Sequence, residues 1–213
     1  MVCIGGTIYT IGIDQSYSNF AYVIFDENEE VIDRGVLHTG DNNESNSKKQ
    51  FGRYYNSTQE QLEYLYSEFK PVVSKYSPCQ LVFEGLSFGS IGNRVFDLGG
   101  LFYFITTSLM MDGLVSIKNI HTITPTSAKK LARDHLDKDD QYEKDKAGNV
   151  VIAKNKKPKV KKMDKPDMLK ALNNTKDKWI VDGYSASSVK IQTGVKDLPD
   201  AYWLGKTFLK GVV

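Results

Sequence analysis

The sequence is poor in the residues that build covalent cross-links and soft metal sites. Its 213 residues include two cysteines and three histidines. Cys3 and Cys79 offer neither a disulfide framework nor the close spacing of a zinc site, which is typical of a protein in a reducing compartment. We therefore expect a cytoplasmic protein that is not secreted.

Long apolar runs are also missing. No stretch reaches the roughly 18 consecutive apolar residues of a transmembrane helix. The N-terminal segment, which Asp14 interrupts, lacks the basic start of a signal peptide. An excess of one charge is absent as well, because the formal net charge is only +2. We therefore expect that the protein does not bind a membrane. We also expect that its surface is not basic all over.

What remains is the composition of an ordinary globular protein, with 40% hydrophobic and 25% charged residues. A chain of this length can bury a core of its own. No internal repeat is present. We expect a single domain over residues 1–213, with a basic loop inserted at about 137–163.

The first informative pattern is an acid at the end of a predicted strand. Residues 8–14 alternate with a period of two, so the apolar side chains face a core and Asp14 lies on the other face. After a polar turn, residues 21–25 and 31–37 predict two further strands. A chance acid at a strand end is the ordinary interpretation. The alternative is a cation at Asp14, because a partly desolvated carboxylate needs compensation.

A second acid ends a second predicted strand. Residues 51–73 have the spacing of an amphipathic helix, and residues 80–84 form a short apolar run that ends at Glu84. A buried strand between helices is usually central in its sheet. The glycine-rich turn that follows carries one aromatic residue, Phe88, and one cation, Arg94.

The next predicted helix, at about 95–111, is apolar nearly all round. A helix without a polar face is either buried or part of an interface. Gly99 and Gly100 would let another helix approach closely, so we favour a homodimer interface over plain burial.

The C-terminal half predicts a strand at 116–123 and a helix that starts near Thr124 and contains Lys129 and Lys130. Periodicity is absent from 134 to 163. This lysine-rich segment is either a solvated insertion or a flexible phosphate-binding arm.

Two further helices follow. One is predicted at 164–173, with Asp164 as its N-cap. Residues 179–193 predict a loop or short helix. In the last helix Asp197 and Asp200 lie three residues apart at the N-terminus, so they can share one face there and are favoured by the helix dipole.

Four carboxylates gathered in one place repel one another unless divalent cations stabilise them. Oxygen ligands alone select Mg²⁺ or Mn²⁺. Two such ions can activate a water and stabilise the leaving oxygen in phosphodiester cleavage.

The order of these elements resembles the RNase H-like fold, and within it the RuvC-type Holliday junction resolvases. The implied fold is α/β, with a mixed central sheet of three antiparallel strands followed by parallel strands, flanked by helices. Five segments carry the resemblance: IGIDQSYSNFAYVIFD at 11–26, LVFEGLSFGSIGNRVFDLGG at 81–100, TPTSAKKLARD at 124–134, KKMDKPDMLKAL at 161–172 and KDLPDAYWLGKTF at 196–208.

The resemblance implies roles for particular residues. The catalytic metal ligands would be the four acids, holding two Mg²⁺ ions that Mn²⁺ can replace: Asp14, Glu84, Asp197 and Asp200. Lys165 would contact the scissile phosphate, with Lys129 or Lys130 in a lesser role. Further DNA contacts would come from Lys161, Lys162 and Arg94, and Phe88 lies near the position of an aromatic that stacks at the opened junction.

Two features depart from the bacterial pattern. The turn at 15–18 lacks the usual Pro-Gly, and the basic loop is longer. The chain is more similar to phage or viral branches of the family, for which the cytoplasm would be that of a bacterial host. These departures leave the cleavage sequence and the strictness for four-way junctions open.

The predicted function is a homodimeric, Mg²⁺-dependent endonuclease that resolves four-way DNA junctions by paired nicks. One alternative is another RNase H-like nuclease, acting on flaps, forks or RNA–DNA hybrids. A second is a junction-binding protein without catalysis. A third, an ATP-dependent sugar or acetate kinase, requires a second duplicated domain for which this chain is too short.

Overall fold

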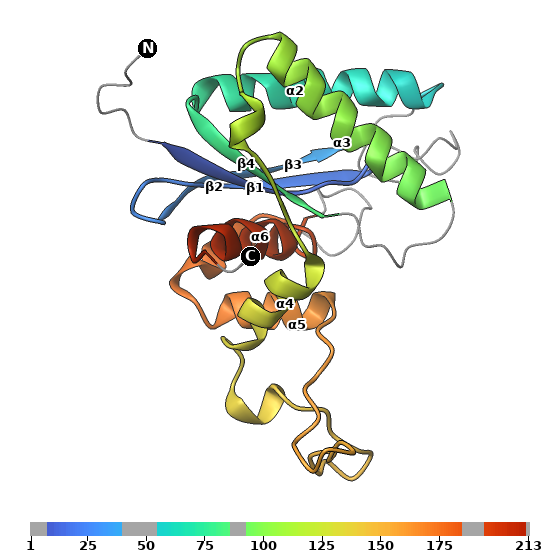
Figure 1. Ribbon diagram of the computed structural model, residues 1–213, viewed down its shortest axis with the longest axis vertical. Coiled ribbons are helices and arrows are strands. Elements are labelled where there is room, and N and C mark those ends of the chain that lie inside the picture. The colour runs from blue at the N-terminus through green and yellow to red at the C-terminus, as the bar shows by residue number, and fades with distance from the viewer. Residues whose placement is uncertain (1–7, 40–54, 86–92, 185–193, 212–213) are drawn as a thin grey trace.

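The computed structural model describes residues 8–39, 55–85, 93–184 and 194–211. A five-stranded sheet with the order β3-β2-β1-β4-β5 lies at its centre (Figure 1). Its strands are β1 (Tyr9–Asp14), β2 (Asn19–Phe25), β3 (Val31–His38), β4 (Cys79–Glu84) and β5 (Ile120–Ile123).

The first three strands are antiparallel, whereas β4 and β5 run parallel to β1. This is the predicted mixed sheet, and β4 is central as expected, with β1 and β5 as its neighbours. Because β1, β4 and β5 are parallel, their C-terminal ends meet at one edge of the sheet. Asp14 and Glu84 both lie at that edge.

Helices α2 (Thr58–Lys75) and α3 (Asn93–Met111) cover one face of the sheet (Figure 1). The predicted helix at 51–73 begins later, because the side chain of Ser57 caps α2 by accepting a hydrogen bond from the backbone N–H of Glu60. Its first predicted residues, 51–54, lie outside the described part of the chain.

The other face carries α4 (Pro125–Arg133), α5 (Lys165–Asn173) and α6 (Leu198–Leu209), and Figure 1 shows α6 directly against the sheet. The predicted caps of the first two helices are confirmed. Thr124 caps α4, and Asp164 forms a reciprocal capping box with Asp167 at α5.

Two predictions of secondary structure are corrected. The strand predicted at 116–123 is shorter, because a 3-10 turn, η1 (Ile117–Asn119), precedes β5. The strand predicted at 31–37 is one residue longer, because His38 is the last residue of β3, where it pairs with Asn19. The region predicted as a loop or short helix begins with a 3-10 helix, η3 (Lys176–Val181), and its residues 185–193 lie outside the description.

Glycines let α6 approach β1 closely. A Cβ atom on Gly12 would clash with the carbonyl oxygen of Ala201 and would lie 2.7 Å from the backbone nitrogen of Gly205. A Cβ atom on Gly205 would in turn clash with the ring of Phe25. Since two of these neighbours are backbone atoms, the approach leaves no room for a side chain on the strand.

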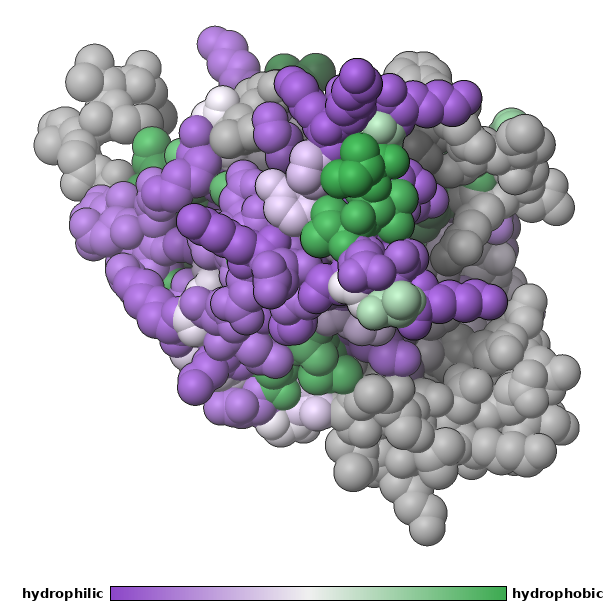
Figure 2. All heavy atoms as spheres, turned by 90° about the horizontal axis from the view of Figure 1, so that it is seen from below, coloured by the Kyte–Doolittle hydropathy of each residue, from purple (hydrophilic) through white to green (hydrophobic). Residues whose placement is uncertain are grey.

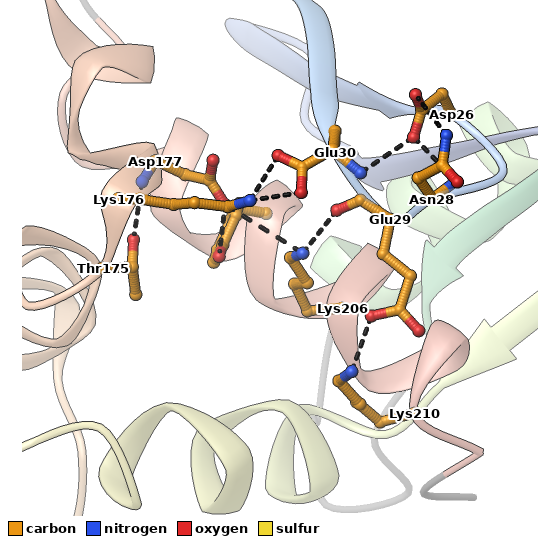
Figure 3. Close-up of polar contacts among 10 residues, drawn as sticks. Asp26, Asn28, Glu29, Glu30, Thr175, Lys176, Asp177, Lys206 and Lys210 are labelled. Carbon is orange, nitrogen blue, oxygen red and sulfur yellow. Dashed lines mark hydrogen bonds and ion pairs between the residues drawn. The ribbon is translucent and has the colours of Figure 1, made fainter.

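The C-terminal half of α6 is held by the turn between β2 and β3. Lys206 donates a hydrogen bond of 2.6 Å to the carbonyl of Glu29, and Lys210 lies 2.6 Å from the Glu29 carboxylate (Figure 3). Lys176 pairs with Glu30 beside them. Burial lowers the pKa of Lys206. These contacts fix α6 against the strands and so fix the position of its N-terminus.

The basic segment predicted as a flexible loop has local structure. After α4 comes a 3-10 turn, η2 (Lys138–Asp140), and then three isolated antiparallel bridges: Tyr142 with Val160, Lys144 with Val150, and Ile152 with Pro158. Figure 1 shows this segment projecting away from the sheet, beyond α4 and α5. No helix in the described ranges is long and apolar enough to cross a membrane.

Candidate active site

A pocket of about 530 Å³ opens at the edge where β1 and β4 end. The N-terminal residues of three helices also border it, through Pro125 of α4, Lys165 of α5 and Asp200 of α6. The carboxylates that were predicted as a group all line this pocket: Asp14, Glu84, Asp197 and Asp200.

Lys165 is the cation at the centre of this group. Its ammonium nitrogen lies 2.7 Å from Asp197 Oδ1, 3.4 Å from Asp200 Oδ2 and 3.8 Å from Asp14 Oδ2. About half of the Lys165 side chain, 48%, is accessible to solvent. One flexible, solvent-facing cation therefore bridges acids from a strand and from a helix that are far apart in the sequence.

Asp14 is the carboxylate of the site whose charged form is strongly disfavoured by its surroundings. It is only 8% exposed. Burial, followed by the nearby charge of Asp200, raises the pKa of Asp14 well above its ordinary value, and Lys165 offsets only part of this rise. Glu84 and Asp197 raise it further. A carboxylate in this position gains strongly from any additional cation.

The acid pair of α6 lies where the helix dipole favours negative charge. Asp197 is at the N-cap position and Asp200 in the first turn. Burial raises the pKa of Asp200, whereas Lys165 and Lys129 lower it. Although burial disfavours its charge, the acids raise the pKa of Lys165 above its ordinary value. The lysine therefore stays charged at neutral pH.

The chemistry of the donor set fits hard divalent cations, because every candidate ligand is a carboxylate oxygen. Within the described residues, however, no group of three or more His, Cys, Asp or Glu side chains is arranged to hold a metal ion as it stands. Three of the acids, Asp14, Asp197 and Asp200, lie around the ammonium of Lys165 instead. The candidate ligands are thus of the chemical type that such an ion binds.

The other residues predicted to bind DNA lie in different surroundings. Lys129 lines the pocket, whereas Lys130 and Lys162 are exposed outside it. Lys161 forms a 2.5 Å ion pair with the buried Asp167 at the start of α5. Arg94 is in the first turn of α3, and its side chain is not described. Phe88 lies outside the described residues.

Three polar residues near the acids were not predicted as part of the site. Gln15 is buried beside Asp14 and donates a 3.3 Å hydrogen bond to the carbonyl of Glu84. The side chains of His38 and Asn19 are hydrogen-bonded at 2.5 Å, and both residues are at the same edge of the sheet. Extending the alternation of β3 by one residue would have placed His38 there.

The strand order, with three antiparallel strands followed by two parallel ones, is that of an RNase H-like fold. No protein-family model and no curated protein match the chain. Among solved structures, it is similar to RuvC of Thermus thermophilus, with a TM-score of 0.52 and 11% identity over 94% of this chain and 92% of that one.

A second similar structure is Thermus thermophilus RuvC in complex with a Holliday junction substrate, with a TM-score of 0.51 and 10% identity over 94% and 91% of the two chains. The yeast mitochondrial Holliday junction resolvase Ydc2 aligns with a TM-score of 0.49 and 14% identity over 95% and 80%. At these identities the likeness to RuvC concerns the fold, and it confirms the predicted fold class.

Proposed function

We propose that this protein is a metal-dependent endonuclease that cleaves branched DNA, and four-way junctions in particular. The observation that carries the proposal is the convergence of Asp14, Asp197 and Asp200 on Lys165, in an open pocket at the strand edge of a RuvC-like fold. The similar solved structures support the substrate class, since one is a RuvC structure in complex with a Holliday junction substrate.

Two Mg²⁺ ions, for which Mn²⁺ can substitute, would be held by Asp14, Glu84, Asp197 and Asp200. When bound, such ions activate a water and stabilise the leaving oxygen of a phosphodiester. Asp14 is the residue that gains most from them, because its charge is buried and faces other acids. The resemblance implies products with 5′-phosphate and 3′-hydroxyl ends, which a ligase can reseal.

In this proposal Lys165 interacts first with the acids of the site and then with the scissile phosphate. Without metal it neutralises the acids at 2.7 to 3.8 Å. Its long, half-exposed side chain would let it turn toward the scissile phosphate once the acids have another cation. Lys129 borders the same pocket and adds positive potential for the DNA backbone. The chain's own cations thus help to position the phosphate.

Paired nicks require two active sites, and α3 offers a surface for a second copy. One side of α3 is buried on the sheet through Leu101, Ile105 and Leu109. The opposite side exposes Phe96 at 87% and Met111 at 83%. Such an exposed apolar face is typical of an interface. We expect Phe96→Glu to give a monomer in sedimentation equilibrium, and an unchanged mass would place the interface elsewhere.

The substrate class is tested by cleavage of a synthetic immobile four-way junction, a flap and a linear duplex, each with and without Mg²⁺. Paired symmetric nicks in the junction alone, only with metal, would support a resolvase. Equal cutting of flap and junction would indicate the broader branched-DNA nuclease. Tight junction binding without cutting under any metal would indicate a binding protein.

A further inference from the structure

The basic segment at 141–162, called the basic arm below, is folded by its own backbone. Glu143 donates to the carbonyl of Lys159, Val151 donates to the carbonyl of Glu143, and Lys159 donates to the carbonyl of Val151, each at 2.8 Å. Three short extended pieces are therefore bonded to one another in a closed set. A solvated insertion without a role does not require such cross-bonding.

Side chains close the turns between these pieces. Asp145 Oδ1 accepts hydrogen bonds of 2.9 Å from the backbone of Ala147 and Asn149, and Gly148 has the left-handed φ of +86°. Asn155 Oδ1 accepts one of 3.1 Å from the backbone of Lys157. Asp145 and Asn155 therefore stabilise the two turns, and Asp145 forms no ion pair with a described lysine.

The basic arm carries eight lysines and only two acids. Lys159 pairs with Glu143, and Lys161 pairs with Asp167 of α5. None of the other six forms an ion pair with another described residue: Lys144, Lys146, Lys154, Lys156, Lys157 and Lys162. A folded element that concentrates unpaired like charges is stabilised by a polyanion, because the anion removes their mutual repulsion.

The base of the basic arm is attached to the helices that border the pocket. Lys161 forms a 2.5 Å pair with the buried Asp167, and Lys170 of α5 forms a 2.6 Å pair with Asp140. The guanidinium of Arg133 donates a 3.4 Å hydrogen bond to the carbonyl of Lys161. Two residues beyond the arm, Asp164 caps the helix whose first residue is Lys165. The base of the arm is therefore fixed beside the pocket, and the rest of the arm extends beyond α4 and α5 (Figure 1).

We propose that the basic arm is a second DNA-contact surface, which grips the phosphate backbone of duplex DNA beyond the nucleotides in the pocket. This inference rests on the proposed function and adds a binding element to it. Duplex DNA has the complementary property, a dense and regular row of negative charges. Contacts of this kind position the substrate without reading its sequence.

The exposed surface of the arm also includes apolar side chains, with Ile152 at 59%, Val160 at 47% and Val150 at 37%. Figure 2 views the molecule from the end where Figure 1 shows the arm, and its green patches there are small and surrounded by purple side chains. Lysines with a few apolar residues also suit an anionic membrane. The attachment of the arm beside the pocket favours DNA, and vesicles provide the comparison.

The test is equilibrium binding of the full-length protein to a four-way junction and to a linear duplex in metal-free buffer, at several salt concentrations. The variant combines Lys154→Gln, Lys156→Gln and Lys157→Gln. Losing three phosphate contacts should reduce the steepness of log K against log salt by about 2 to 3. The corresponding triple Arg variant should keep the wild-type slope, because it retains the charges.

A charge control combines Lys118→Gln and Lys178→Gln, two exposed lysines of η1 and η3 that, like the arm lysines, form no ion pair with another described residue. If the arm variant and this control have equal slopes, the arm is not a DNA contact. Binding to anionic vesicles that is lost only in the arm variant, with DNA binding intact, would also overturn the proposal. A slope effect in a protein that cuts no junction would support the arm and reject the nuclease function.

Discussion

The two faces of strand β1 are both buried, but they pack against different layers. Ile11 and Ile13 enter an apolar cluster beneath α2 and α3. Gly12 and Asp14 face α6, where a glycine permits close backbone contact and an acid lies at the edge of the pocket. The face toward α2 and α3 contributes buried apolar surface. The face toward α6 has a glycine in place of a larger side chain, which lets the carboxylates come close together.

The difference shows how one alternating strand serves stability and function separately. On the apolar face, a change of side chain should alter the free energy of unfolding and leave the chemistry alone. On the face toward α6, the same kind of change should disturb the geometry around Lys165. Substitutions on each face, and the pH dependence of stability, can test this separation.

Asp14→Asn should reduce junction cleavage below detection and leave junction binding intact. The substitution removes the buried charge and preserves the shape of the side chain. Gel-based cleavage with Mg²⁺ and fluorescence anisotropy in metal-free buffer would measure the two effects. Residual cleavage near the wild-type rate would remove Asp14 from the mechanism.

Gly12→Ala should destabilise the protein by about 1 to 3 kcal/mol, the usual cost of overpacking. It should also slow cleavage, because α6 must shift and carries Asp197 and Asp200 with it. Gly100→Ala is the matched control, since its Cβ atom would have only the hydroxyl of Tyr17 within reach, at 3.7 Å. Urea unfolding of both variants would compare them, and equal destabilisation would contradict the close approach.

The stability of the metal-free protein should depend on pH through Asp14. Because its pKa is raised in the folded state, the folded protein binds a proton more readily than the unfolded chain above pH 3.8. Stability should therefore fall as pH rises through the interval between 3.8 and the raised value. Asp14→Asn should remove this fall, and each kcal/mol gained would raise the unfolding midpoint by about 2 to 4 °C.

Thermal unfolding in a chelating buffer, at a series of pH values, would compare the wild type with Asp14→Asn. The difference between their midpoints should widen as pH rises above the acidic range. If the difference between the midpoints does not change with pH, the charge of Asp14 does not destabilise the folded protein.

Ile13→Val should have the smallest effect. It deletes one buried methylene on the face toward α2 and α3, at a cost of about 0.5 to 1.5 kcal/mol. The cleavage rate at saturating metal should match that of the wild type. A marked loss of cleavage would show that the two faces of β1 are not independent.

Much of this arrangement could be predicted because its signals are local. Asp14 and Glu84 end apolar strands, and Asp197 and Asp200 have the spacing of one helix face. The contact between Gly12 and Gly205 could not be predicted, since each glycine is ordinary within its own element and only the packing of α6 on β1 brings them together.

The basic segment and Lys165 were predicted, but the local structure of the arm and the ion pairs of Lys165 could not be. The arm has no periodicity, because its order comes from turn hydrogen bonds such as those of Asp145 and from bonds between very short segments. Lys165 was linked to the phosphate by resemblance alone. Its ion pairs with Asp197 and Asp200 depend on how α5 and α6 pack against each other.

The central claim is that Lys165 holds the carboxylates in place of divalent cations. Calorimetric titration of Mn²⁺ into the DNA-free wild type, Lys165→Met and Asp14→Asn tests it most directly. We expect binding by the wild type, tighter binding by Lys165→Met because its competing ammonium is gone, and weak or no binding by Asp14→Asn. Equal or weaker binding by Lys165→Met, or no binding by either of the first two, would contradict it.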